Sequence, residues 1–123
     1  MVSPSAGSVV LVAFPFSDLS ETKLRPAVVL ASAGRDDLIL CQVTSNPYSD
    51  VDAIELTDGD FLSGALQRVS FARPGKLFTA NNSLIRAEIG RLCPDAFARV
   101  RKAVFSVLGR SGEVSNKTRG DDA

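Results

Sequence analysis

The fold is decided by the stretch from Pro26 to Val43, PAVVLASAGRDDLILCQV. Two short apolar runs, Pro26–Ala31 and Asp37–Val43, lie on either side of the turn residues Gly34-Arg35-Asp36. Runs of this length, separated by a polar tripeptide that contains glycine, are typical of an antiparallel β-hairpin. The stretch therefore predicts two paired strands, with Cys41 as an ordinary small residue of the core.

The neighbouring sequence repeats this pattern of short strands. The nearly continuous apolar run Ser8–Phe14 stops at Pro15, which is typical of a strand buried on both faces. Further strands are predicted at Val51–Leu56, Arg68–Ala72 and Lys76–Thr79, with a turn at Asp58–Asp60 and a break at Pro74-Gly75. Many short strands in one small chain predict a mainly β fold, a small barrel.

The spacing of apolar residues becomes helical near the C-terminus. The stripe consists of Ala96, Phe97, Val100, Ala103, Val104, Val107 and Leu108. It predicts a C-terminal α-helix that has Pro94 in its first turn, ends at Gly109 in the left-handed conformation, and caps the barrel. From residue 110 onward aliphatic residues almost vanish. We therefore expect a single domain over residues 1–109 and a disordered tail over residues 110–123.

Composition excludes several classes of protein. The 123 residues include no histidine, so neither a Ser/His/Asp triad nor a His-ligated zinc site can be built. The two cysteines, Cys41 and Cys93, are far apart and form no CxxC pair, which argues against a disulfide framework, a redox pair or a thiolate metal site. No apolar run approaches the ~18 residues that a membrane span needs. These features predict a reduced, cytoplasmic protein with no membrane segment, no metal and no cofactor.

Opposite charges are segregated along the chain, although the net charge is zero. Residues 1–66 carry three basic and nine acidic side chains, whereas residues 67–123 carry eleven and five. The basic half would suit a polyanion such as a nucleic acid. The alternative is that its charges are solvated or pair with the acidic half on folding.

Polar residues gather at the end of the predicted hairpin that lies away from its turn. Arg25 comes directly before the first apolar run, and Thr44-Ser45-Asn46 comes directly after the second. Counting outward from the turn places Arg25 and Thr44 at the same edge, so a guanidinium and a hydroxyl would converge on one patch. A guanidinium fork suits a phosphate. The alternatives are a surface salt bridge from Arg25 to Asp18 or Glu21, and an ordinary turn after Thr44.

Three segments together resemble a known family. They are GSVVLVAFPFSDL from Gly7, KLRPAVVL from Lys23, and Thr44-Ser45. In order and spacing they are similar to the MazF/PemK/Kid toxins of bacterial toxin-antitoxin pairs, over roughly residues 7–108. The resemblance implies an SH3-like barrel with a C-terminal helix, a homodimer, and a metal-independent endoribonuclease that cleaves single-stranded RNA and is held off by a cognate antitoxin. It also implies that Arg25 and Thr44 are the catalytic residues.

One departure from the family pattern concerns proton transfer. Members of the family often carry an Asp-Gln pair where this chain has Gln67-Arg68-Val69-Ser70, which contains no carboxylate. The proton acceptor is therefore unidentified, and Asp18, Glu21 and Asp50 are the nearest carboxylates by sequence. A non-catalytic RNA- or peptide-binding member of the same fold is the alternative function. A gyrase-directed poison on this fold is a third hypothesis, but it would leave Arg25 and Thr44 without a role.

Single-stranded RNA is bound through phosphate contacts and through stacking on aromatic rings. The predicted RNA-binding residues are Phe16, Lys23, Ser45, Asn46, Arg73 and Lys76. Phe16 and Tyr48 are the aromatic residues next to the two catalytic candidates, although Phe16 would equally suit the core. Phe14, Phe97 and Phe105 follow the spacing of core residues.

Overall fold

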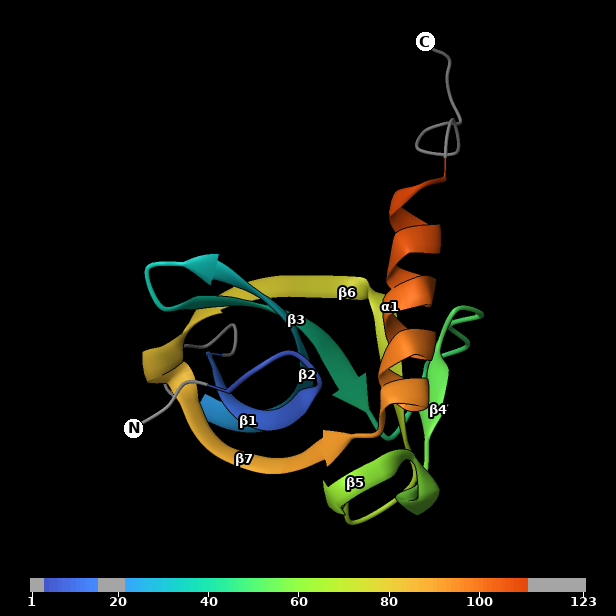
Figure 1. The fold of residues 1–123 in the computed structure, drawn as a ribbon, viewed down its shortest axis with the longest axis horizontal. Coiled ribbons are helices and arrows are strands. Elements are labelled where there is room, and N and C mark those ends of the chain that lie inside the picture. The colour runs from blue at the N-terminus through green and yellow to red at the C-terminus, as the bar shows by residue number, and fades with distance from the viewer. Residues whose placement is uncertain (1–3, 16–21, 111–123) are drawn as a thin grey trace, which may run out of the picture.

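The computed structural model describes residues 4–15 and 22–110. Its elements are β1 (Ser8–Pro15), β2 (Thr22–Gly34), β3 (Asp37–Thr44), β4 (Ile54–Leu56), the 3₁₀ helix Asp58–Asp60, β5 (Phe61–Gly64), β6 (Ser70–Asn81), the 3₁₀ helix Asn82–Leu84, β7 (Ile85–Leu92) and α1 (Pro94–Leu108). The strands form one antiparallel sheet in the order β4-β6-β3-β2-β1-β7-β5. This sheet curls on itself, and α1 stands at one side of the curl (Figure 1). The predicted mainly β barrel with a C-terminal helix is confirmed.

The central strands are buried on both faces of the sheet. Neighbouring residues contribute to two separate core clusters: Val9 and Val28 to one, and Val10 and Val29 to the other. This is the burial predicted for the run that begins at Ser8, because successive side chains of a strand point to opposite faces. Cys41 is also fully buried, and desolvation raises the pKa of its thiol to about 12. Its predicted role as a core residue is confirmed.

The hairpin that carries the site is also confirmed. Strands β2 and β3 are connected by Arg35 and Asp36, which have φ values of 52° and 65°. Two successive positive φ values are the geometry of a tight hairpin turn, whose twist matches that of the strands. Gly34, at φ 88°, accommodates the preceding bend.

The predicted break at Pro74-Gly75 is wrong, because β6 runs from Ser70 to Asn81 without interruption. The pairing with β3 instead skips residues there: Cys41 faces Leu77, whereas Val43 faces Ala72. This irregularity accommodates the proline, which has no N–H to give to a ladder. The Cys41 thiol donates to the Arg73 carbonyl oxygen at 3.2 Å and holds the bulged segment against the sheet.

Other strand boundaries differ from the predictions. The strand expected over Val51–Leu56 is reduced to β4, and the predicted turn at Asp58–Asp60 is a 3₁₀ helix. Two strands, β5 and β7, were not predicted, because their sequences contain glycines and charged residues. The glycines have a packing role. A Cβ on Gly64 would lie 2.1 Å from the Ile89 carbonyl oxygen, and one on Gly90 would lie 2.8 Å from the Phe61 ring.

Helix α1 begins and ends as predicted, with Pro94 in its first turn. It buries Ala96, Val100 and Val104, and the first two complete the core cluster that contains Val9. Three details are wrong. The C-cap residue Gly109 is right-handed, with φ −86°. Phe105 and Leu108 are 64% and 66% exposed, although their spacing suggested the core. Within the described segments, no helix is long and apolar enough to cross a membrane. The predicted tail lies outside the described residues except for Arg110.

Candidate functional site

A cleft of about 540 Å³ opens at the end of the β2–β3 hairpin that lies away from its turn. Its lining residues are Leu11, Leu24, Arg25, Pro26, Val43, Thr44, Ser45, Asn46, Tyr48, Ala65, Leu66, Gln67, Arg68, Ser70 and Ile89. The lining combines apolar side chains with two guanidinium groups, four hydroxyls and two amides. An apolar cavity with a few convergent polar groups is the usual form of a ligand site.

The structure brings Arg25 and Thr44 to this cleft, as the strand count predicted. Arg25 lies in β2 opposite Val12 of β1, and Thr44 is the last residue of β3. Both residues are partly exposed, so their polar ends are accessible while regular strands hold their backbones. A ligand in the cleft would therefore meet groups fixed by the sheet rather than by a loop.

The segment after Thr44 folds back on itself through local hydrogen bonds. The Asn46 N–H donates to Thr44 Oγ1 at 3.1 Å, and the Thr44 hydroxyl has the Asn46 carbonyl oxygen as an acceptor at 3.1 Å. The Tyr48 N–H donates to Asn46 Oδ1 at 3.0 Å. Side-chain turns of this kind are the local reason why Thr and Asn follow a strand. They are compatible with a site because they fix Thr44 Oγ1 at the cleft.

Arg73 contacts the chain that follows Asn46, at Tyr48 and Asp50. Tyr48 and Ser49 have φ values of 54° and 63°, a conformation that is uncommon for residues other than glycine. The Arg73 Nε donates to Asp50 Oδ2 at 2.9 Å, and its guanidinium lies 5.7 Å from the centre of the Tyr48 ring. The hydrogen bond from Arg73 holds the pKa of Asp50 below its ordinary value. Arg73 thus binds both sides of a strained turn.

Arg68 and Gln67 were missed as site residues by the sequence analysis, although both line the cleft. They lie in the connection between β5 and β6, and the buried Ser70 hydroxyl donates to the Arg68 carbonyl oxygen at 3.1 Å. The sequence indicated only that this stretch lacks a carboxylate. Its position depends on the close packing of β5 on β7 at Gly64 and Gly90, which no local pattern predicts.

The other predicted site residues have different positions. Ser45 and Asn46 line the cleft, whereas Lys23, Arg73 and Lys76 do not. Lys23 and Lys76 are exposed. Phe16, Asp18 and Glu21 lie outside the described residues. The third candidate acceptor, Asp50, is bonded to Arg73, and the described residues that line the cleft include no carboxylate.

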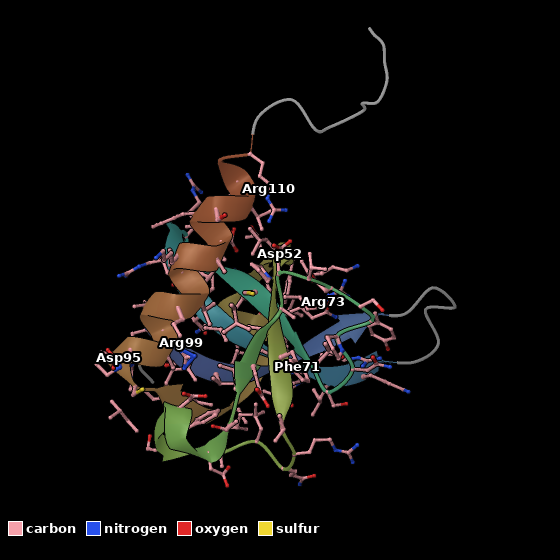
Figure 2. All side chains as sticks on the ribbon, turned by 90° about the vertical axis from the view of Figure 1, so that its right-hand side faces the viewer. Asp52, Phe71, Arg73, Asp95, Arg99 and Arg110 are labelled. Atoms are coloured by element: carbon pink, nitrogen blue, oxygen red, sulfur yellow. The ribbon has the colours of Figure 1, made fainter. Side chains whose placement is uncertain are left out.

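Ion pairs connect the basic and acidic halves of the chain within the described residues: Arg73 pairs with Asp50, Arg99 with Asp60, and Arg110 with Asp52. Figure 2 shows Arg110 beside Asp52 at the end of α1, and Arg99 lower on the same helix. The alternative that the two halves pair on folding is therefore confirmed for these three arginines. Arg25 and Arg68 both line the cleft, and the alternative ion-pair partners predicted for Arg25, Asp18 and Glu21, lie outside the described residues.

Comparison with known proteins agrees with the motifs. The sequence model of the PemK-like, MazF-like toxins of type II toxin-antitoxin systems matches residues 5–108. No match was found among curated protein sequences.

Solved structures share the fold at low sequence identity. MazE-MazF (form II) from Deinococcus radiodurans is 24% identical at a TM-score of 0.71, covering 90% of this chain and 100% of that one. An endoribonuclease in complex with its cognate antitoxin from a mycobacterial species is 14% identical at a TM-score of 0.67, covering 89% and 96%. The Mycobacterium tuberculosis toxin MazF-mt6 is 14% identical at a TM-score of 0.64, covering 82% and 95%.

Proposed function

Because the chain belongs to the PemK-like, MazF-like toxin family of type II toxin-antitoxin systems, we propose that it is an endoribonuclease that cleaves single-stranded RNA in the cytoplasm. The observation that carries the proposal is the cleft in which Arg25, Thr44 and Arg68 meet. Two guanidinium groups and a hydroxyl, with no carboxylate among the described lining residues, suit a phosphodiester anion.

In the proposed reaction the RNA supplies the nucleophile. The 2′-oxygen loses its proton to solvent and attacks the adjacent phosphorus, and the bond from phosphorus to the 5′-oxygen breaks. The products are a 2′,3′-cyclic phosphate and a 5′-hydroxyl, whose oxygen takes up a proton from solvent. Arg25 stabilises the negative charge that develops on the phosphorane, the largest contribution that a protein can make to such a step. No metal is needed, since the guanidinium supplies the positive charge.

Thr44 is proposed to align the phosphate for attack. Its Oγ1 already accepts the Asn46 N–H, so its own proton can turn from the Asn46 carbonyl oxygen toward a phosphate oxygen. A hydroxyl held in this way restricts the phosphate to the in-line orientation.

We expect the RNA on either side of the cleaved bond to contact residues at the cleft and beside it. Ser45 and Asn46 line the cleft, and the exposed Lys23 and Lys76 are proposed phosphate contacts. Phe16 remains a proposed stacking residue from the sequence alone. The contacts of Arg73 with Asp50 and Tyr48 favour a positioning role over direct contact with RNA.

A non-catalytic binding protein is the second candidate function, and the lack of a described carboxylate in the cleft favours it. Incubation of the purified protein with a long unstructured RNA in excess EDTA separates the two. Cleavage at a discrete set of sites, leaving 2′,3′-cyclic phosphate ends, supports the nuclease. Binding of the RNA without cleavage supports the second candidate.

A cognate antitoxin is the proposed protein partner, by analogy with the mycobacterial endoribonuclease–antitoxin complex. An extended acidic segment would compete with RNA for the cationic cleft. We expect competition by an acidic peptide that weakens as salt rises, because both ligands displace counterions from the same cations. Competition that is independent of salt would contradict this arrangement.

We also propose that the protein is a homodimer. A barrel of this size leaves large apolar side chains uncovered: Val51, Phe105 and Leu108 are 94%, 64% and 66% exposed. Burial against a second copy would remove this surface from water. Sedimentation at micromolar concentration should give twice the monomer mass, whereas Phe105→Asp should shift the protein toward monomer. A monomeric wild-type protein would contradict the proposal.

A further inference from the structure

A second cavity of about 440 Å³ adjoins the cleft. Its lining residues are Leu56, Thr57, Asp58, Gly59, Phe61, Leu66, Gln67, Arg68 and Val69. Three of them, Leu66, Gln67 and Arg68, also line the cleft with Arg25 and Thr44. The two cavities are therefore neighbours on either side of one short segment, and the cationic Arg68 lies between them.

The second cavity has the chemistry of a site for a planar polar ring. Its apolar lining consists of Phe61, Leu66, Val69 and the fully buried Leu56. Its volume lies within the range of about 300–1,000 Å³ that is usual for small-molecule sites. An aromatic and aliphatic lining suits stacking and apolar contact with a nucleobase.

Asp58 contributes a carboxylate to the lining of this cavity. Asp58 is exposed, and its carboxylate makes no hydrogen bond within residues 4–15 and 22–110. The adjacent Thr57 hydroxyl, in contrast, is in contact with Asp60 Oδ2 at 3.3 Å. A carboxylate is purely an acceptor, so Asp58 would take a hydrogen bond from a ligand amino group.

We propose that the second cavity binds the base of a nucleotide next to the cleaved phosphodiester, and that Asp58 selects a base with an exocyclic amino group. This inference rests on the proposed function and deepens it by assigning a specificity site. The scissile phosphate occupies the cleft at Arg25 and Thr44. Arg68, on the wall shared by the two cavities, contacts the phosphate between the nucleotide in the second cavity and the nucleotide in the cleft. Adenine, cytosine and guanine carry an amino group that donates to Asp58, whereas uracil carries none.

The test compares Asp58→Asn with the matched variant Asp36→Asn. Both replace an exposed aspartate by its isosteric amide, but Asp36 lies in the hairpin turn between β2 and β3. Each protein cleaves a pool of RNA of random sequence in EDTA, and sequencing of the product ends gives the base frequencies around the cut. Circular dichroism and thermal melting confirm that both variants are folded.

The wild-type protein is expected to disfavour uracil at one position beside the cut. Asp58→Asn should reduce that discrimination by about tenfold, the effect of losing one charge-assisted hydrogen bond, and Asp36→Asn should retain it. If the wild-type protein cleaves RNA but Asp58→Asn has the same base preferences, the inference is overturned and the nuclease proposal survives. If the wild-type protein cleaves no RNA, the proposed function fails, and the specificity site fails with it.

Discussion

Polar residues lie at both ends of the hairpin formed by β2 and β3. At the turn end they bond to one another, whereas at the other end they line a cleft. At the turn end, Asn81 Nδ2 donates to Asp37 Oδ1 at 3.1 Å, and the Asn82 N–H donates to the Asp36 carbonyl oxygen at 2.7 Å. Polar groups of the turn and of β3 there bond to Asn81 and Asn82. These residues line none of the three best-formed cavities in the described part of the chain.

The other end of the hairpin has a similar number of polar residues but a different arrangement. Arg25 and Thr44 face a cleft of about 540 Å³ together with Arg68, and no described lining residue is acidic. The comparison teaches that polar residues at a strand end are insufficient to indicate a site. What distinguishes the end proposed as the site is a cavity whose described lining carries charges of one sign.

The largest effect is expected for Arg25, at the end of the hairpin that lines the cleft. Arg25→Ala should reduce RNA cleavage about a hundredfold, roughly 3 kcal/mol of transition-state stabilisation, as does the loss of an oxyanion donor. The matched change at the turn end, Arg35→Asn, keeps the positive φ that asparagine tolerates and should leave cleavage unchanged. Initial rates on a defined RNA measure both. Equal rates for Arg25→Ala and the wild-type protein would remove Arg25 from the mechanism.

Thr44→Val should have the next largest effect. The change keeps the shape of the side chain but removes the hydroxyl that accepts the Asn46 N–H, so we expect about a tenfold loss of rate. Thr44→Ser, which retains the hydroxyl, should recover most of the activity. Thr79→Val, at an exposed position of β6, is the surface control. A Val variant as active as the Ser variant would show that the hydroxyl has no role.

Much of the fold was predictable because local patterns determine it. The turn at Gly34-Arg35-Asp36, the strand that begins at Ser8 and the helix from Pro94 each follow from the spacing of apolar residues and from turn chemistry. The strands β5 and β7 were not predicted, because they depend on close packing between Gly64 and Gly90 that periodicity does not encode.

The candidate site also contains residues that the local sequence predicts and residues that it does not predict. The convergence of Arg25 and Thr44 follows from counting residues along a hairpin, which is a local property. Arg68 reaches the cleft only because β5 crosses onto β7 at the other edge of the sheet. Arg73 could be identified as a cation near the site, but its bond to Asp50 depends on the path of the segment between β3 and β4. Tertiary contacts of this kind leave no periodic signal in the sequence.

A smaller effect is expected for Arg73→Ala. This variant tests whether Arg73 contacts RNA or only positions the turn beside the cleft. Loss of the bond to Asp50 should lower the free energy of unfolding by about 1 kcal/mol and should reduce cleavage less than Thr44→Val does. If Arg73 only holds the turn, the dependence of RNA binding on salt should keep its wild-type slope. Lys76→Ala, by contrast, should reduce the slope of log K against log salt by about 0.7. An equal reduction for Arg73→Ala would make Arg73 a phosphate contact.

The smallest expected effect is a change in how the stability of the fold depends on acidic pH. The hydrogen bond from Arg73 holds the pKa of Asp50 below its ordinary value, so the folded state favours the charged carboxylate. This contribution to stability is fully present above the unfolded pKa of about 3.9 and is lost as pH falls through the lower, folded value. Denaturant titrations from pH 6 downward should therefore show a steeper loss of stability below about pH 4 for the wild-type protein than for Asp50→Asn. If Asp50→Asn instead follows the wild-type curve, the bond between Arg73 and Asp50 contributes nothing to the turn beside the cleft, and Thr44 must be held by its bonds to Asn46 alone.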